Sequence, residues 1–364
     1  MSILVGIKGL ELYYYTKVET MRYILKDANI YATNLQYMND SEEYANGLKE
    51  LGEIINKSQN RELITKQQLF DELKREATSY SISFSAARDL LSQWSMYAGE
   101  SGVSIKMRFN GNEKYQAFVV DDKITDKKSE KREYLTNQPI RPQKVYYCTK
   151  EAMTLQEYEK VKEEVWGTIK NTTSKQMLND VQNMVFIWKE MAPYVKRAEF
   201  RAEAEYRLVF DWTQLLHRFR IDYRNDKNVL KPYLDIKCEG GWPIWEIIVG
   251  PGFNQDVVYK SILHFLNHQE LSLPKLSGAQ YLERCEEYLE SCGKMPKKVE
   301  EIWCQKHQYI EKVDEKMRYN EFQNIRAEML RSMRKNVRFR NQLEKKDLTK
   351  DGIILSKSRI PYVF

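Results

Sequence analysis

The sequence predicts a mixed α+β fold, in which strands and helices follow one another without regular alternation. Strand-like segments are scattered over the first 275 residues, helical segments separate them irregularly, and a long helix-rich segment precedes one last strand-like segment. A regular βαβ alternation would instead predict a parallel sheet between two helical layers. We therefore expect a core at 1–275, a helical, basic insertion or appendage at 276–350, and a final strand at 351–364 that returns to the core.

The predicted strands are runs rich in aromatic and β-branched residues, or runs in which apolar and polar side chains alternate. They lie at 10–16, 30–33, 79–85, 103–109, 115–120, 143–148, 205–210, 219–223, 232–236, 245–249 and 353–363. A turn must follow Val249, because the next residues are Gly250, Pro251 and Gly252.

The predicted helices have apolar residues at helical spacing, or are long segments with few helix-breaking residues. They lie at 17–27, 42–76, 89–97, 154–194, 256–267 and 279–343, the last with breaks near 293–296. Asn39, Asp40 and Ser41 precede the second of them, and their side chains are typical of helix caps. The charged stretch at 121–132 is expected to be a loop.

The composition is that of a globular protein, with 42% hydrophobic and 30% charged residues, and it excludes a disordered chain. The five cysteines are an odd number and are widely spread, so no disulfide framework is predicted and a reducing compartment is favoured. The first residues do not resemble a signal peptide, and no run approaches the roughly 18 apolar residues of a membrane helix. We therefore expect a cytoplasmic protein without a membrane partner.

The positive charge is concentrated in one segment. The net charge is +6, and residues 317–346 carry nine Lys or Arg against three Glu. A localised basic stretch attracts phosphates, so this segment is a candidate nucleic-acid or protein-binding module. Its candidate contact residues are Arg326, Arg331, Arg334, Lys335, Arg338 and Arg340. The alternative is a solvated helix face.

The most specific candidate for chemistry is the pair Glu203 and Glu205, at the entry to the predicted strand 205–210. Residues two apart in a strand point to the same face, so both carboxylates are expected to project together. Two like charges so placed raise one pKa and create an acid and base pair. The alternative is a solvent-facing strand edge.

Two further strands carry candidate pocket residues. Ser83 and Ser85 have the same two-residue spacing, and two hydroxyls on one face line a polar pocket or satisfy backbone groups. The aromatic run that ends at Thr16 offers a tyrosine for stacking on a planar ring or for core packing. Cys304 with His307, and His264 with His268, lack the further ligands of a zinc site, so no metal is predicted.

Six motifs in order resemble the bacterial domain-of-unknown-function 2971 family, over about residues 11–265 and the last ten. They are Tyr13-Tyr14-Tyr15-Thr16, Ala32-Thr33 with Tyr37-Met38-Asn39-Asp40 and Glu43, Phe84-Ser85 with Leu91, Trp94, Tyr97 and Gly102-Val103, Glu203-Ala204-Glu205-Tyr206-Arg207-Leu208, Glu246-Ile247-Ile248-Val249-Gly250-Pro251, and Ser358-Arg359-Ile360-Pro361-Tyr362. Members of that family resemble abortive-infection and phage-defence proteins. The resemblance implies a defence toxin. A partner that controls the activity is a further candidate partner of the chain.

A second resemblance is to the ADP-ribosyltransferases, which use three strand-borne positions in order: His or Arg, then Tyr or Ser, then Glu. The matching positions are Tyr14, Ser83 or Ser85, and Glu205, with Tyr14 departing from the family pattern. This resemblance implies an ADP-ribosyltransferase-like mixed sheet, and NAD as a substrate that the enzyme consumes, either as an ADP-ribosyltransferase or as an NAD glycohydrolase.

In that enzyme Glu205 would stabilise the charge on the ribose, and Glu203 would orient or deprotonate the acceptor. The residues implied for NAD binding are Tyr14, Thr16, Ser83, Ser85, Trp94 and Tyr97. A non-catalytic nucleic-acid-binding or protein-binding module and a scaffold remain the alternatives, and the oligomeric state is open.

Overall fold

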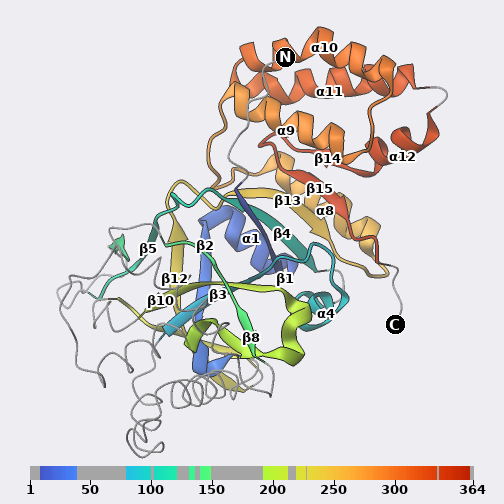
Figure 1. Cartoon of the computed structure of the whole chain (residues 1–364). Helices are drawn as coiled ribbons and strands as arrows, with labels where there is room; N and C mark the ends of the chain where they lie inside the picture. Colours follow the sequence, from blue (N-terminus) through green and yellow to red (C-terminus); the bar gives the residue numbers. More distant parts are fainter. Residues whose placement is uncertain are drawn as a thin grey trace, which may run out of the picture. The chain divides into compact units, whose positions relative to one another are not determined.

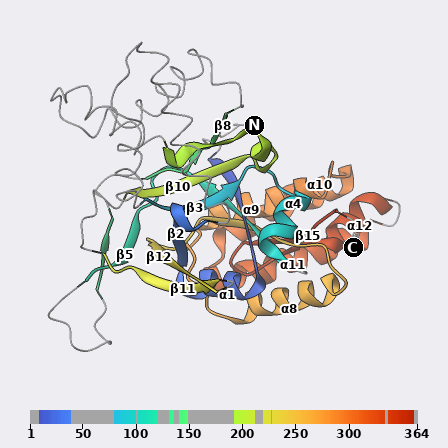
Figure 2. The ribbon, with the colours of Figure 1, turned by 90° about the horizontal axis from the view of Figure 1, so that it is seen from below.

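The computed structural model describes residues 9–38, 79–99, 102–120, 131–135, 140–148, 192–211, 219–226, 228–333 and 336–360. These residues form a mixed α+β protein, which confirms the predicted fold class (Figures 1 and 2). The chain divides into two compact units, each assembled from separate segments. Unit 1 contains residues 1–29, 87–110 and 238–364, and unit 2 contains residues 30–86 and 111–237.

Unit 1 contains a mixed sheet whose described strands run in the order β14-β15-β13-β4-β1. Their bounds are β1 Leu10–Thr16, β4 Val103–Phe109, β13 Ile244–Val249, β14 Asp347–Leu348 and β15 Ile354–Lys357. β13 and β15 are parallel, and the other neighbours are antiparallel. A parallel pair needs a long crossover, which the helices between β13 and β15 in the sequence provide.

Polar side chains share one face of this sheet. Tyr13 lies opposite Lys106, and Lys106 lies opposite Glu246, so their side chains project from the same face. Next to them on this face, Tyr15 and Ile248 pack with Trp94 and Ala98 in a small apolar cluster. The face therefore combines buried charge with aromatic packing.

The helices of unit 1 follow the predicted segments, except that the segment predicted at 279–343 is also divided between Lys312 and Glu315 and between Ser332 and Val337. They are α1 Val18–Asp27, α4 Leu91–Gln93, the π-helical turn η2 Trp94–Ala98, α8 Gln255–His268, α9 Gly278–Ser291, α10 Lys297–Lys312, α11 Glu315–Ser332 and α12 Val337–Lys345. Local chemistry sets several of these bounds. Ser277 and Gln280 form a reciprocal capping box at the start of α9. Ala28 ends α1 in a left-handed conformation, with φ 57°.

The helical segment shares its core with the sheet of unit 1. Helices α9 to α12 lie together in both views (Figures 1 and 2). Phe322 and Leu289 of these helices are fully buried, in one apolar cluster with Trp245 of β13 and Ile354 of β15. The segment is therefore part of the packing of unit 1.

Unit 2 contains short strands in the order β3-β2-β12-β5-β6, and β10 pairs with β3 and β7 while β11 pairs with β12. Strands β8 and β9 form a separate parallel pair. The bounds are β2 Asn29–Asn34, β3 Ser79–Ser85, β5 Tyr115–Phe118, β6 Arg132–Tyr134, β7 Gln143–Lys144, β8 Tyr146–Cys148, β9 Val195–Arg197, β10 Glu205–Asp211, β11 Asp222–Asp226 and β12 Val229–Cys238. Three 3-10 segments accompany them: η1 Leu35–Tyr37, η4 Ala192–Tyr194 and η5 Ala198–Glu203.

Some predicted elements have different bounds in the structure, and others lie outside the described residues. Arg132, predicted as the end of a charged loop, begins β6, and the strand predicted at 219–223 begins only at Asp222. The predicted caps at 39–41, the helix at 42–76 and most of the helix at 154–194 lie outside the described residues. None of the helices that the structure describes is both long and apolar enough to span a bilayer.

Candidate functional site

The predicted carboxylate pair belongs to a buried cluster of four charged side chains in unit 2. The cluster consists of Lys196, Glu203, Glu205 and Arg207, whose exposed fractions are 5%, 6%, 5% and 2%. The Lys196 Nζ atom lies 2.7 Å from Oε2 of Glu203 and 3.2 Å from Oε2 of Glu205. Two formal positive charges therefore face two formal negative charges away from solvent, which is how charged groups are tolerated in an interior.

Strand β10 aligns Arg207 with Glu205. The two residues are two apart in one strand and so project from the same face. Arg207 donates from Nε to Oε1 of Glu205 at 2.7 Å, and from Nη2 to Oε2 at 3.0 Å. Its Nη1 atom donates to the Pro193 carbonyl oxygen at 2.7 Å. This bidentate arrangement fixes the orientation of the Glu205 carboxylate.

Glu203 reaches the cluster by a different route from the predicted one. It lies in the 3-10 segment η5, and Ala204 adopts a left-handed conformation with φ 44° before β10 begins at Glu205. The expectation that Glu203 and Glu205 share a strand face is therefore wrong. The turn at Ala204, and the shared contact with Lys196, bring the two carboxylates together instead.

The electrostatics of Glu205 also differ from the prediction. Burial raises the pKa of its carboxyl group, but Arg207 and Lys196 outweigh burial and lower the pKa to about 2. The expected acid and base pair with one raised pKa is therefore wrong for Glu205, which is ionised at neutral pH. Beside it, the Tyr147 hydroxyl accepts a hydrogen bond from the Glu205 backbone N–H at 2.7 Å. Burial raises the pKa of Tyr147 to about 12, so the hydroxyl remains neutral.

The two serines lie on the strand next to the carboxylates. In the antiparallel pair of β3 and β10, Ser85 lies opposite Glu205, and Ser83 lies opposite Arg207. The Ser85 hydroxyl donates to the backbone carbonyl of Glu203 at 2.6 Å. The Ser83 hydroxyl contributes to the lowered pKa of Glu205. These serines and the carboxylates therefore form one group within unit 2.

The remaining residues predicted to bind NAD belong to unit 1. Thr16 and Trp94 are buried, and Tyr14 and Tyr97 are half-buried. Trp94 is 2% exposed and donates from Nε1 to Oδ1 of Asp89 at 2.7 Å. These four side chains are part of the sheet of unit 1 and the packing around it.

The basic segment divides into half-buried and exposed side chains. Arg326 donates to the backbone carbonyls of Leu343 and Lys346 at 2.7 and 3.1 Å, and thereby joins α11 to the end of α12. Arg331, Arg338 and Arg340 are exposed.

Among these three, Arg340 forms an ion pair with Glu344 at 2.9 Å. Arg334 and Lys335 lie outside the described residues. Of the residues predicted to contact a nucleic acid or protein, Arg331, Arg338 and Arg340 are thus exposed to solvent.

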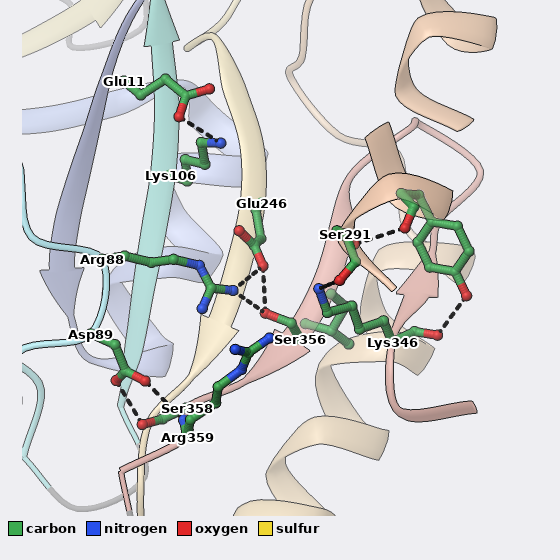
Figure 3. A network of polar contacts seen from close by, with 12 residues as sticks. Glu11, Arg88, Asp89, Lys106, Glu246, Ser291, Lys346, Ser356, Ser358 and Arg359 are labelled. Carbon is green, nitrogen blue, oxygen red and sulfur yellow. Dashed lines mark hydrogen bonds and ion pairs between the residues drawn. The ribbon is translucent and has the colours of Figure 1, made fainter. Parts of the chain in front are cut away.

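A second polar network, in unit 1, was not predicted (Figure 3). Oε1 of Glu246 accepts hydrogen bonds from Arg88 Nη2 and from the Ser356 hydroxyl, both at 2.6 Å. Asp89 accepts hydrogen bonds from the Ser358 hydroxyl and the Arg359 N–H, at 2.7 and 2.8 Å. The signal in the sequence is Glu246 itself, because it is a charged residue inside the otherwise apolar strand IWEIIV.

Possible metal ligands do not converge in the described residues. No group of three or more His, Cys, Asp or Glu side chains there is arranged to hold a metal ion. Cys238, Cys285, Cys292 and Cys304 form no disulfide bond with one another.

The fold and the site define a mixed α+β protein with a buried, ion-paired carboxylate pair. No protein-family model, no curated protein and no solved structure matches the chain. The function is therefore argued from the site itself.

Proposed function

We propose that the chain is an NAD-consuming enzyme of the ADP-ribosyltransferase type, acting as a defence toxin, with Glu205 as its central carboxylate. The observation that carries this proposal is the setting of Glu205, a buried carboxylate that Arg207 holds at 2.7 and 3.0 Å and Lys196 contacts at 3.2 Å. Arg207 and Lys196 also lower the pKa of this carboxyl group, which keeps it ionised. A carboxylate held ionised in a dry site is a strong stabiliser of developing positive charge.

The reaction that this carboxylate suits is cleavage of a glycosidic bond. When the bond between nicotinamide and ribose C1′ breaks, its electron pair leaves with nicotinamide, and the ribose passes through an oxocarbenium-like state. Glu205 stabilises that positive charge and accepts a hydrogen bond from a ribose hydroxyl. The acceptor then forms a bond with C1′, and its proton passes to Glu203.

Lys196 links the two carboxylates in this proposal. It contacts Oε2 of Glu203 at 2.7 Å and Oε2 of Glu205 at the longer distance of 3.2 Å. A ribose hydroxyl therefore competes with the weaker of the two contacts, and Lys196 stays paired with Glu203. The neighbouring Ser83 and Ser85, on the paired strand β3, are the residues proposed to line the nicotinamide side.

Incubation of the purified protein with labelled NAD and cell lysate tests the proposal. The wild type is expected to release nicotinamide and transfer label, and Glu205→Gln is expected to lose both activities. The matched control is Glu344→Gln, at an exposed carboxylate on α12, which is expected to keep full activity. Unchanged activity in Glu205→Gln, or no turnover by the folded wild type, would contradict the proposal.

A binding module in the helical segment is the second candidate. The observation that favours it is that Arg331 and Arg338 are exposed and form no ion pair with any residue the structure describes. Such cations are available to phosphates of a nucleic acid or to an acidic protein.

Charge reversal tests this candidate. Binding of a short double-stranded DNA is expected to fall steeply with salt, and to be lost in the double variant Arg331→Glu and Arg338→Glu. The double variant Lys298→Glu and Lys312→Glu, at exposed positions on α10, is the control of equal charge change. An equal loss of DNA binding in the control would show that net charge alone determines binding, and it would contradict a binding site at Arg331 and Arg338.

A further inference from the structure

Unit 1 contains three cations around one carboxylate, apart from the residues of the proposed function. Arg88 lies 2.6 Å from Oε1 of Glu246 through Nη2. The ammonium of Lys346 interacts electrostatically with Glu246, Arg88 and Arg359. Figure 3 shows Arg88 and Arg359 pointing toward Ser356 of β15. The last strand and its neighbours thus gather positive charge.

These cations retain unused hydrogen-bond donors among the described residues. Arg88 donates only through Nη2, to Glu246 and Ser356, so Nε and Nη1 are unused. Lys346 donates through Nζ to the Ser291 carbonyl oxygen at 2.9 Å, which uses one of its three N–H groups. The guanidinium of Arg359 is exposed and makes no bond to a described residue, since only its backbone N–H is engaged.

Lys346 is a buried cation that forms no ion pair with any residue the structure describes. It is 6% exposed, and a buried ammonium is costly without a charged partner. Burial lowers the pKa of Lys346, Glu246 raises it, and Arg88 and Arg359 lower it further. The nearby Glu246 is already bonded to Arg88 and Ser356 through Oε1.

Two more groups, on the polar face of the sheet of unit 1, have unused hydrogen-bonding capacity. Tyr13 is 7% exposed, and its hydroxyl makes no hydrogen bond to a described residue. Burial and then Glu246 raise the pKa of Tyr13 to about 12, so the hydroxyl is a neutral donor. Oε2 of Glu246 likewise accepts no hydrogen bond from the described residues, because both bonds to this carboxylate reach Oε1.

We propose that Arg88, Lys346 and Arg359 bind the phosphate group of a small phosphorylated, hydroxyl-bearing molecule. Tyr13 adds a hydroxyl donor, and Oε2 of Glu246 accepts a hydroxyl of the ligand. Three cations face the carboxylates of Glu246 and Asp89, and a phosphate ester contributes about one to two negative charges at neutral pH. The guanidinium groups supply planar donors suited to phosphate oxygens.

Calorimetric titration of the full chain with ribose 5-phosphate tests this site. The wild type is expected to bind ribose 5-phosphate, and ribose at the same concentration is expected not to bind. Inorganic phosphate is expected to bind more weakly than ribose 5-phosphate, because it lacks the hydroxyl that Glu246 would accept. All titrations are made at one ionic strength, set with sodium chloride, so that differences in affinity among the ligands do not arise from different screening of charges.

Two variants on neighbouring positions give the matched comparison. Arg359→Ala removes an exposed guanidinium without a partner, so the fold is retained and affinity for ribose 5-phosphate is expected to fall at least tenfold. Lys357→Ala removes an adjacent positive charge that projects from the other face of β15 and pairs with Asp256, and it is expected to leave affinity unchanged.

The proposal is overturned if the wild type binds ribose 5-phosphate no better than ribose, or if Arg359→Ala binds as well as the wild type. Equal binding of inorganic phosphate and ribose 5-phosphate would overturn the role of Glu246. Because the site lies in unit 1, Glu205→Gln is expected to bind ribose 5-phosphate normally. A failure of the proposed NAD chemistry can therefore be distinguished from a failure of the phosphate site.

Discussion

Arg207 donates two hydrogen bonds to Glu205, at 2.7 and 3.0 Å, although the two residues lie only two positions apart on β10. The pairing follows from the strand itself, which projects both side chains from one face. Both residues of the pair belong to β10, and Lys196 of β9 completes the charge balance. The carboxylate most suited to catalysis is therefore also a structural ion-pair partner.

Acid is expected to destabilise the protein through Glu205. Its pKa falls from 4.5 in the unfolded chain to about 2 in the folded protein, because Arg207 and Lys196 outweigh burial. A lowered folded-state pKa contributes stability that is fully present above pH 4.5 and is lost as the pH falls towards 2. The loss is on the order of 3 kcal/mol. Urea unfolding of the wild type and Glu205→Gln at pH 7, 4 and 2.5 measures this loss of stability. If the free energies of unfolding of the two proteins fall equally with pH, the prediction is contradicted.

Arg207→Lys is expected to destabilise the protein in spite of the retained charge. An ammonium cannot reproduce the two parallel hydrogen bonds to Glu205 while also bonding to the Pro193 carbonyl oxygen. The expected cost is about 3 kcal/mol in the free energy of unfolding. Arg331→Lys on the exposed face of α11 is the control, with an expected change within about 0.5 kcal/mol. Urea midpoints compare the two variants.

Ala204→Gly is expected to stabilise the fold. Ala204 adopts φ 44° between the two carboxylates, a left-handed conformation that costs an alanine roughly 1 to 2 kcal/mol. Glycine removes that strain but loses more entropy on folding, so the net gain is about 0.5 to 1 kcal/mol. Ala117→Gly, in the extended strand β5, is expected to be destabilising. Thermal unfolding of both variants decides the sign.

Phe322→Ala is expected to weaken the whole of unit 1. Phe322 is fully buried, and its ring lies 5.6 Å from that of Tyr288 and 6.4 Å from that of Trp303, in the cluster that includes Ile354 of β15. The expected cost is about 3 to 5 kcal/mol. Hydrogen exchange is expected to accelerate in β15 as well as in α11. Acceleration confined to the helices would contradict the shared core.

Val257→Ala provides the control for this experiment. Val257 lies on α8 with 67% of its surface exposed, so its truncation removes an apolar group without opening a cavity. The expected change is within about 0.5 kcal/mol.

Local patterns predicted the elements of the sheets well. The strands at Leu10–Thr16, Ser79–Ser85 and Val103–Phe109 have the bounds that their aromatic or alternating sequences indicate. These segments are mostly buried, so their patterns reflect contacts within regular strands. The short strands β6 and β14 were missed, because two or three residues do not establish a period.

The partners of the candidate site could not be predicted in the same way. Lys196 reaches Glu203 and Glu205 from another segment of the chain, and only the tertiary fold brings it there. The sequence also does not indicate the positive φ of Ala204, because alanine rarely adopts a left-handed conformation. The charge of the basic segment did not reveal that Arg326 is a half-buried residue that donates to helix-end carbonyls.

The parallel pairing of β13 with β15 has a consequence for biosynthesis. Ile247 of β13 lies beside Leu355 of β15, and the intervening residues form α8 to α12. During translation, β13 leaves the ribosome well before its partner strand is made, so the edge of β13 that pairs with β15 is unpaired in the meantime. The nascent chain can therefore complete unit 2, whose last residue is Lys237, before unit 1 closes.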